Sequence, residues 1–132
     1  MVPIELDGSP LRLLVHHNVV IVEDQPQTAS YTYRLSSGDD KRDWVLRWEY
    51  QRSPATDYDY PSAHLHANAS FLDAGTEMTN PLERLHVATA RVAFELVLWH
   101  SIADWGVEPR TPDWRDILLA SIAEFEERRT AP

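Results

Sequence analysis

Apolar and polar residues alternate along three stretches within the first 70 residues of the chain. These stretches are ASYTYRLS at 29–36, DWVLRWEYQR at 43–52 and PSAHLHANAS at 61–70. Because successive side chains of an extended strand point to opposite faces, each stretch predicts a half-buried β-strand. A turn rich in Ser, Gly and Asp joins the first two stretches, so we expect them to form a β-hairpin.

The residues before these strands allow two interpretations. SPLRLLVHHN at 9–18 predicts a short N-terminal helix, because Ser9 suits the N-cap and Pro10 suits the first helical position. A strand over residues 11–22 is the alternative, since VVIV at 19–22 has the pattern of an extended segment.

Helical patterns dominate the last third of the chain, after RLHVAT at 84–89, which predicts one more short strand. The segment 93–105 is apolar almost all round, which is typical of a mostly buried helix, and Gly106 suits its end. TPDWRDILLASIAEFEERR at 111–129 predicts a final helix, with acids near its start and arginines near its end.

Strands followed by helices predict an α+β fold. We expect residues 1–132 to form a single α+β domain: an antiparallel sheet of four or five strands with two C-terminal helices packed on one face. The alternation further predicts that Trp44, Leu46, Trp48 and Tyr50 share the face toward the helices.

Composition and charge narrow the classes of function. The chain has no cysteine, which excludes disulfides, thiolate catalysis and zinc–thiolate sites. It has neither a signal-peptide pattern nor an apolar run of membrane-spanning length, so a cytoplasmic protein with no membrane partner is expected. Its formal net charge of −9 disfavours RNA as a partner, because nucleic-acid binding relies on basic residues that neutralise phosphates.

The opposite face of the predicted sheet gathers residues with catalytic chemistry. Every second residue of a strand points to the same face, so the opposite face is expected to carry Arg34, Arg47, Glu49, His64, His66 and His86. Histidines supply a general acid and a general base near neutral pH, and arginines bind phosphate and stabilise a charged transition state. These six are therefore the candidate catalytic residues of a metal-independent ribonuclease.

The ribonuclease interpretation requires no cofactor. The same histidines permit two other interpretations. His64 and His66 project the same way about 6–7 Å apart, so they can share a transition-metal ion with His86 or Glu49 as a third ligand. Alternatively, they form only the solvated side of a half-buried sheet and hydrogen-bond to their neighbours. Tyr60 in the preceding loop either lines a site or packs over the loop.

Three segments also carry a resemblance to a known family. WVLRWEYQR, YPSAHLHANA and RLHVATARVAFELVLWHSIADWGV resemble small uncharacterised actinobacterial proteins and, more distantly, the TumE-type toxins of toxin–antitoxin systems. The shared pattern is a Tyr- and Arg-rich hairpin that leads into a strand with a proline and histidines, here Pro61, His64 and His66. The resemblance implies a growth-inhibiting toxin that acts on RNA and pairs with a helix-turn-helix antitoxin. Toxins of this kind are commonly basic, whereas this chain is acidic.

Three hypotheses follow from the sequence. The first is a toxin-like component of a toxin–antitoxin or defence-type system with ribonuclease chemistry. The second is a non-enzymatic interaction protein, such as an antitoxin, a regulatory subunit or an acidic inhibitor, with a protein partner or a second copy of the chain. The third is a small metal-binding protein with histidine ligands. Convergence of His64, His66 and His86 near Arg34 or Arg47 would favour the first or the third.

Overall fold

A computed structural model of the chain describes residues 2–38, 43–54, 60–68 and 86–130. The elements in chain order are β1 (Val2–Glu5), β2 (Arg12–Val22), β3 (Gln25–Ser36), β4 (Trp44–Gln51), β5 (Ala63–Ala67), β6 (Val87–Ala88), α1 (Phe94–Ala103) and α2 (Trp114–Thr130). One antiparallel sheet precedes two C-terminal helices, so the predicted α+β class is confirmed. The described residues give this sheet six strands rather than the four or five expected.

The chain divides into two compact units. The first consists of Met1–Glu5 with Leu11–Arg91, and it holds the sheet; the second consists of Leu6–Pro10 with Val92–Pro132, and it holds the helices. The expectation that residues 1–132 form a single domain stays a prediction. No helix in the described ranges combines the length and the apolarity that a membrane crossing requires.

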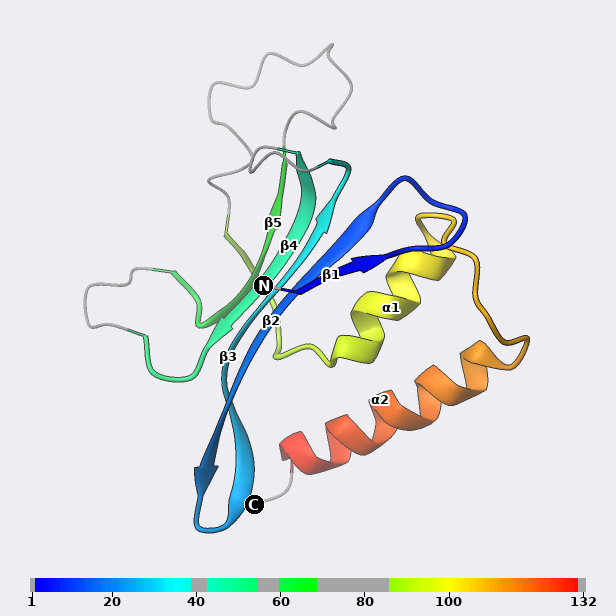
Figure 1. The fold of residues 1–132 in the computed structure, drawn as a ribbon. Coiled ribbons are helices and arrows are strands. Elements are labelled where there is room, and N and C mark those ends of the chain that lie inside the picture. The colour runs from blue at the N-terminus through cyan, green and yellow to red at the C-terminus, as the bar shows by residue number, and fades with distance from the viewer. Residues whose placement is uncertain (1, 39–42, 55–59, 69–85, 131–132) are drawn as a thin grey trace. The chain divides into compact units, whose positions relative to one another are not determined.

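The sheet is a meander. Its strands follow one another in chain order from β1 to β6, and each pairs antiparallel with its neighbour (Figure 1). The hairpin predicted over 29–51 is therefore confirmed as part of β3 and β4. Because side chains directly opposite each other on neighbouring strands share a face, this register decides which candidate residues meet.

The N-terminal helix predicted over residues 9–18 is wrong. Most of this segment belongs to β2, which hydrogen-bonds to β1 on one side and to β3 on the other. Leu11 and Leu13 are buried, so the apolar residues follow a period of two. Ser9 and Pro10 belong instead to the turn after Leu6, where the Ser9 amide donates to the Leu6 carbonyl. The strand over residues 11–22, the alternative interpretation, is the correct one.

A bulge near the start of β4 reverses one predicted orientation. Leu35 pairs with Leu46, but the next residue of β3, Ser36, pairs with Trp44, so Val45 is the extra residue. Trp44 consequently shares a face with Arg47 rather than with Leu46, Trp48 and Tyr50. Strict alternation along β4 therefore fails at its first residue.

Aromatic side chains pack on the face of the sheet that carries Trp48. The rings of Tyr31 and Tyr33 stack with centroids 4.4 Å apart, and His17 meets Tyr33 edge-on at 5.9 Å. The Tyr33 hydroxyl and His17 Nδ1 form a hydrogen bond of 2.9 Å. Tyr33 is only 1% exposed, so the first unit has a packed aromatic cluster on this face.

His17 should make stability depend on pH. Desolvation lowers the pKa of His17 in the folded chain below its usual range, and the positive charge of Arg91 lowers it further. The unfolded chain then binds more protons below about pH 6.5, so the free energy of unfolding falls as pH drops below that value. We expect His17→Gln to lose less stability than wild type between pH 7.5 and 5.5, measured by urea unfolding. An equal loss in both proteins would contradict this role.

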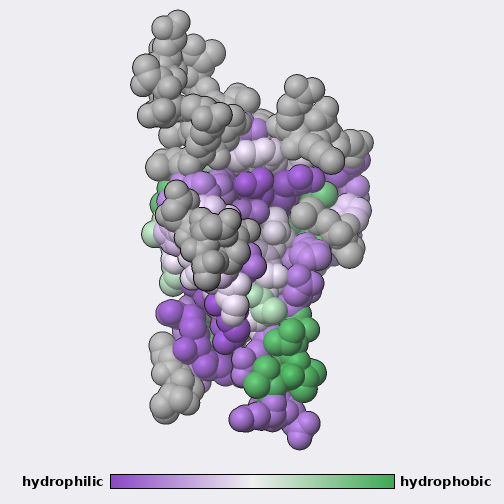
Figure 2. All heavy atoms as spheres, turned by 90° about the vertical axis from the view of Figure 1, so that its left-hand side faces the viewer, coloured by the Kyte–Doolittle hydropathy of each residue, from purple (hydrophilic) through white to green (hydrophobic). Residues whose placement is uncertain are grey.

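The end of the β2–β3 hairpin exposes an apolar patch. Val19, Val20, Ile21 and Val22 are between 42% and 67% exposed, and Figure 2 shows them as the green area near the lower end of the molecule. Contiguous exposed apolar residues often mark an interaction surface.

The second unit is a pair of packed helices. The rings of Trp99 in α1 and Trp114 in α2 lie 5.0 Å apart, and the Ser121 hydroxyl donates to Glu95 Oε1 at 2.8 Å. Gly106 adopts a φ of +70° just after α1, as expected for a glycine that ends a helix. Both predicted helices are therefore confirmed, and α2 begins three residues later than the sequence suggested.

Candidate functional site

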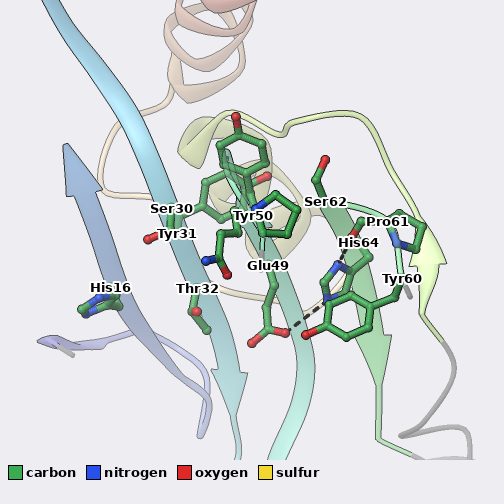
Figure 3. A pocket seen from close by; sticks show the side chains of 12 residues that line it. His16, Ser30, Tyr31, Thr32, Glu49, Tyr50, Tyr60, Pro61, Ser62 and His64 are labelled. Carbon is green, nitrogen blue, oxygen red and sulfur yellow. Dashed lines mark hydrogen bonds and ion pairs between the residues drawn. The ribbon is translucent and has the colours of Figure 1, made fainter. Parts of the chain in front are cut away.

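The register of the sheet aligns five of the six candidate residues in two adjacent rows. Glu49 lies between Thr32 and His64, and Arg47 lies between Arg34 and His66. The predicted grouping of Arg34, Arg47, Glu49, His64 and His66 on one face is therefore confirmed. Figure 3 shows Glu49 and His64 pointing toward each other from neighbouring strands.

His86 joins this group from the residue just before β6. Its ring centroid lies 4.5 Å from that of His66 and 5.0 Å from that of His64, while the His64 and His66 rings are 4.9 Å apart. The structure thus brings together all six candidate residues on one face. Arg84, which period-two geometry assigns to the same face of the predicted strand over 84–89 as His86, lies outside the described residues.

The histidine face is not the solvated surface that one sequence interpretation proposed. His64 is 4% exposed and His66 is 3% exposed. Asn68, at the end of β5, is also buried and donates from Nδ2 to the Trp44 carbonyl at 2.7 Å, which supports the bulge. Alternation shows which side chains share a face, but it does not show how deeply that face is buried.

Three imidazoles converge at the centre of the face, and the carboxylate of Glu49 lies beside two of them. One nitrogen from each of His64, His66 and His86 lies within 4.8 Å of the others. Oε2 of Glu49 lies 3.3 Å from Nε2 of His64 and 3.3 Å from Nε2 of His66. We call these four residues the histidine cluster.

A backbone contact sets the tautomer of His64. Its Nδ1–H donates to the Pro61 carbonyl at 2.6 Å, since a carbonyl oxygen can only accept. In the neutral imidazole, Nε2 then carries a lone pair that faces the carboxylate of Glu49. Nε2 of His64 is therefore the ring nitrogen that is placed to bind a metal ion beside this carboxylate.

The spacing in the cluster suits a tetrahedral metal ion. Zinc binds nitrogen and oxygen ligands at about 2.0–2.1 Å, so neighbouring ligand atoms of a tetrahedron lie about 3.3–3.4 Å apart. Both distances from Glu49 Oε2 match this edge. The nitrogens of the three histidines lie within 4.8 Å of one another, so a bound ion would have to draw them closer together to reach this edge. A backbone carbonyl bonded to Nδ1 is also the usual support of a histidine that binds metal through Nε2.

A polar cavity of about 360 Å³ adjoins the cluster at His64 and Glu49 (Figure 3). Its other polar side chains are those of His16, Ser30, Thr32, Gln51, Tyr60 and Ser62. The ring of Tyr60 stacks on His86 at 4.3 Å and meets His64 edge-on at 4.9 Å. Tyr60 thus lines a site, which was one of its two sequence interpretations.

Two arginines border the cluster on the side away from this cavity. Nε of Arg47 lies 3.1 Å from Oε1 of Glu49, although the two atoms are not aligned as a hydrogen bond. The Arg47 guanidinium also lies 5.0 Å from the centre of the Trp44 ring, a cation–π contact that orients it. Nε of Arg34 is buried and makes no hydrogen bond to the described part of the chain.

His16 is the site residue that the sequence analysis missed. It lines the cavity and pairs with Thr32, in the same row as Glu49 and His64. The helical interpretation of residues 9–18 hid this position, whereas the strand alternative would have placed His16 on this face. His100, in contrast, lies in the second unit and pairs with Asp104 one helical turn later.

Comparisons with protein-family models, with curated proteins and with solved structures gave no match to this chain. The case for function therefore depends on the geometry of the histidine cluster and its neighbours.

Proposed function

We propose that this protein binds a divalent transition-metal ion at the histidine cluster. The observation that carries the proposal is the position of Glu49 Oε2, 3.3 Å from Nε2 of both His64 and His66. His86 completes a set of three nitrogen ligands and one oxygen ligand. Imidazole and carboxylate ligands suit zinc and its neighbours in the first transition row, whereas magnesium prefers oxygen ligands alone.

The neighbouring residues support an open, reactive centre rather than a closed structural one. The cluster adjoins a polar cavity, and its carboxylate also contacts Arg47. Zinc with this ligand set expands to five-coordinate when a fifth ligand arrives, so the cavity offers an approach for a small molecule. We infer a metal-dependent enzyme or a metal-dependent binding protein for a small polar ligand.

Metal analysis tests this proposal directly. Wild type is purified without a histidine tag, incubated with excess zinc, passed over a desalting column and assayed by plasma mass spectrometry. We expect about one zinc ion per chain, and no magnesium after the same treatment. A chain that retains no zinc would overturn the proposal.

The functions implied by the family resemblance stay predictions. Arg34 and Arg47 beside the histidines support chemistry on a phosphate group, which ribonucleases and other phosphoesterases share. The exposed apolar residues 19–22 support the predicted protein partner, whether an antitoxin or a second copy of the chain. The metal proposal differs from the metal-independent ribonuclease, because it assigns the three histidines to an ion rather than to proton transfer.

A further inference from the structure

Arg34 and Arg47 stand directly opposite each other on neighbouring strands. They are register partners of β3 and β4, so their side chains leave the same face about 4.5–5.5 Å apart at Cβ. Two like charges in this position destabilise a sheet unless a negative charge lies between or beside them. The arginine pair therefore requires a counter-charge.

The described strands supply too little negative charge to balance the two arginines. On β3, β4 and β5, the charged side chains of this face are Arg34, Arg47 and Glu49. Glu49 is the one carboxylate, and it is shared between Arg47 and two histidines. A divalent ion at the histidine cluster would raise the formal charge of this set from +1 to +3. Among the described residues of these strands, positive charge therefore exceeds negative charge, and a bound anion would balance it.

The arginines are arranged to hold an oxyanion next to the metal ligands. Arg34, Arg47 and His66 form one row, and Glu49 and His64 lie in the next row, about 6–7 Å along the strands. Trp44 holds one guanidinium plane in place, and Nε of Arg34 is buried without a hydrogen bond to the described residues. A planar guanidinium fork binds phosphate oxygens in pairs, which a point charge cannot do.

We propose that this centre binds the phosphate group of a small phosphate ester. One phosphate oxygen would bind the metal ion as a fifth ligand, and the others would lie on Arg34 and Arg47. This inference rests on the proposed metal function and names the ligand class of the same site. The cavity adjoins the other side of the cluster, at His64 and Glu49, so the remainder of the ester would have to extend past the metal ion to reach it; its volume of about 360 Å³ is that of a small-molecule site. The net charge of −9 favours a small ester over a polynucleotide.

Inorganic phosphate is the probe for a calorimetric titration of the zinc-loaded full chain. We expect phosphate to bind, and we expect Arg34→Gln and Arg47→Gln each to weaken it by about 10- to 100-fold, as for the loss of a charge-assisted contact. Arg34→Lys keeps the positive charge but loses the planar guanidinium, so its affinity for phosphate should lie between those of wild type and Arg34→Gln. Arg115→Gln, on helix α2 outside the first unit, is the matched control and should bind phosphate like wild type.

Zinc content is measured for every variant, so failure of the metal function can be distinguished from failure of the phosphate inference. If zinc is retained but phosphate does not bind at about 1 mM, or binds equally to the Gln variants, the phosphate inference is overturned and the metal function stands. If wild type retains no zinc, the metal function itself fails.

Two phosphate esters then test the class of ligand by displacement of inorganic phosphate. Displacement by p-nitrophenyl phosphate indicates a monoester ligand, and displacement by bis-p-nitrophenyl phosphate indicates a diester, as in RNA. Either result supports a phosphate ester. Failure of both esters to displace phosphate would overturn it.

Discussion

His66→Ala is expected to lower the affinity of the chain for zinc by at least about 100-fold, because even the outer partners of metal ligands are worth 10- to 100-fold. His66 is the central member of the cluster. Its ring lies within 4.9 Å of the rings of His64 and His86, and its Nε2 lies 3.3 Å from Glu49 Oε2. Competition with a chelating zinc indicator measures the change.

Two variants make this result specific to the cluster. His100→Ala removes a half-buried histidine of α1 that pairs with Asp104, and His16→Ala removes a histidine of the same sheet face as the cluster that lines the cavity. Both should bind zinc like wild type. His66→Gln fills most of the volume that alanine leaves, so it tests the ligand even if His66→Ala is unstable. Unchanged zinc affinity in folded His66→Gln would refute the assignment of His66 as a ligand.

Period-two alternation predicted which residues share the face, but it could not predict their distances. Arg47, Glu49, His64 and His66 are assigned correctly from residue numbers alone, because a strand without a bulge repeats every two residues. The contact between Glu49 and both histidines follows from the register of β4 with β5. That register depends on the loop between the two strands and on side-chain packing, which a single sequence does not reveal.

Two of the departures from the predicted fold have local causes. A single extra residue at Val45 moves Trp44 to the face of Arg47, and a bulge has no reliable signal in such a short strand. At the N-terminus, Ser9 and Pro10 form a helix-start signal, but the ladders to β1 and β3 favour a strand. Tertiary pairing overrides a local signal when both sides of a segment find partners.

The net charge of the chain differs in sign from the charge of the described residues at the site. The chain carries −9 overall, which argues against a polyanion, yet the face beside the cluster carries two arginines and one carboxylate. The net negative charge repels long nucleic acids, whereas two adjacent arginines can still bind a small anion. Local charge, which depends on register, is therefore a better guide to the ligand than composition.

Tyr33→Ala should destabilise the chain strongly, by about 3–5 kcal/mol, as for other truncations of a buried aromatic residue. Tyr33 is 1% exposed and stacks on Tyr31 with ring planes 5° apart. It pairs with Trp48 on the strand that also carries Glu49, but it lies on the opposite face from the cluster. Urea unfolding of the zinc-free protein measures the loss without a contribution from bound metal.

Tyr33→Phe separates packing from hydrogen bonding at the same position. It keeps the stacked ring and removes the hydroxyl that bonds to Nδ1 of His17. Because His17 is exposed, water replaces this partner, and we expect a loss of about 0.5–1.5 kcal/mol. Zinc affinity of Tyr33→Phe should equal that of wild type, since its ring does not contact the histidine face. An equal loss of stability in both Tyr33 variants would show that the hydroxyl, rather than the stacked ring, carries the contribution of Tyr33.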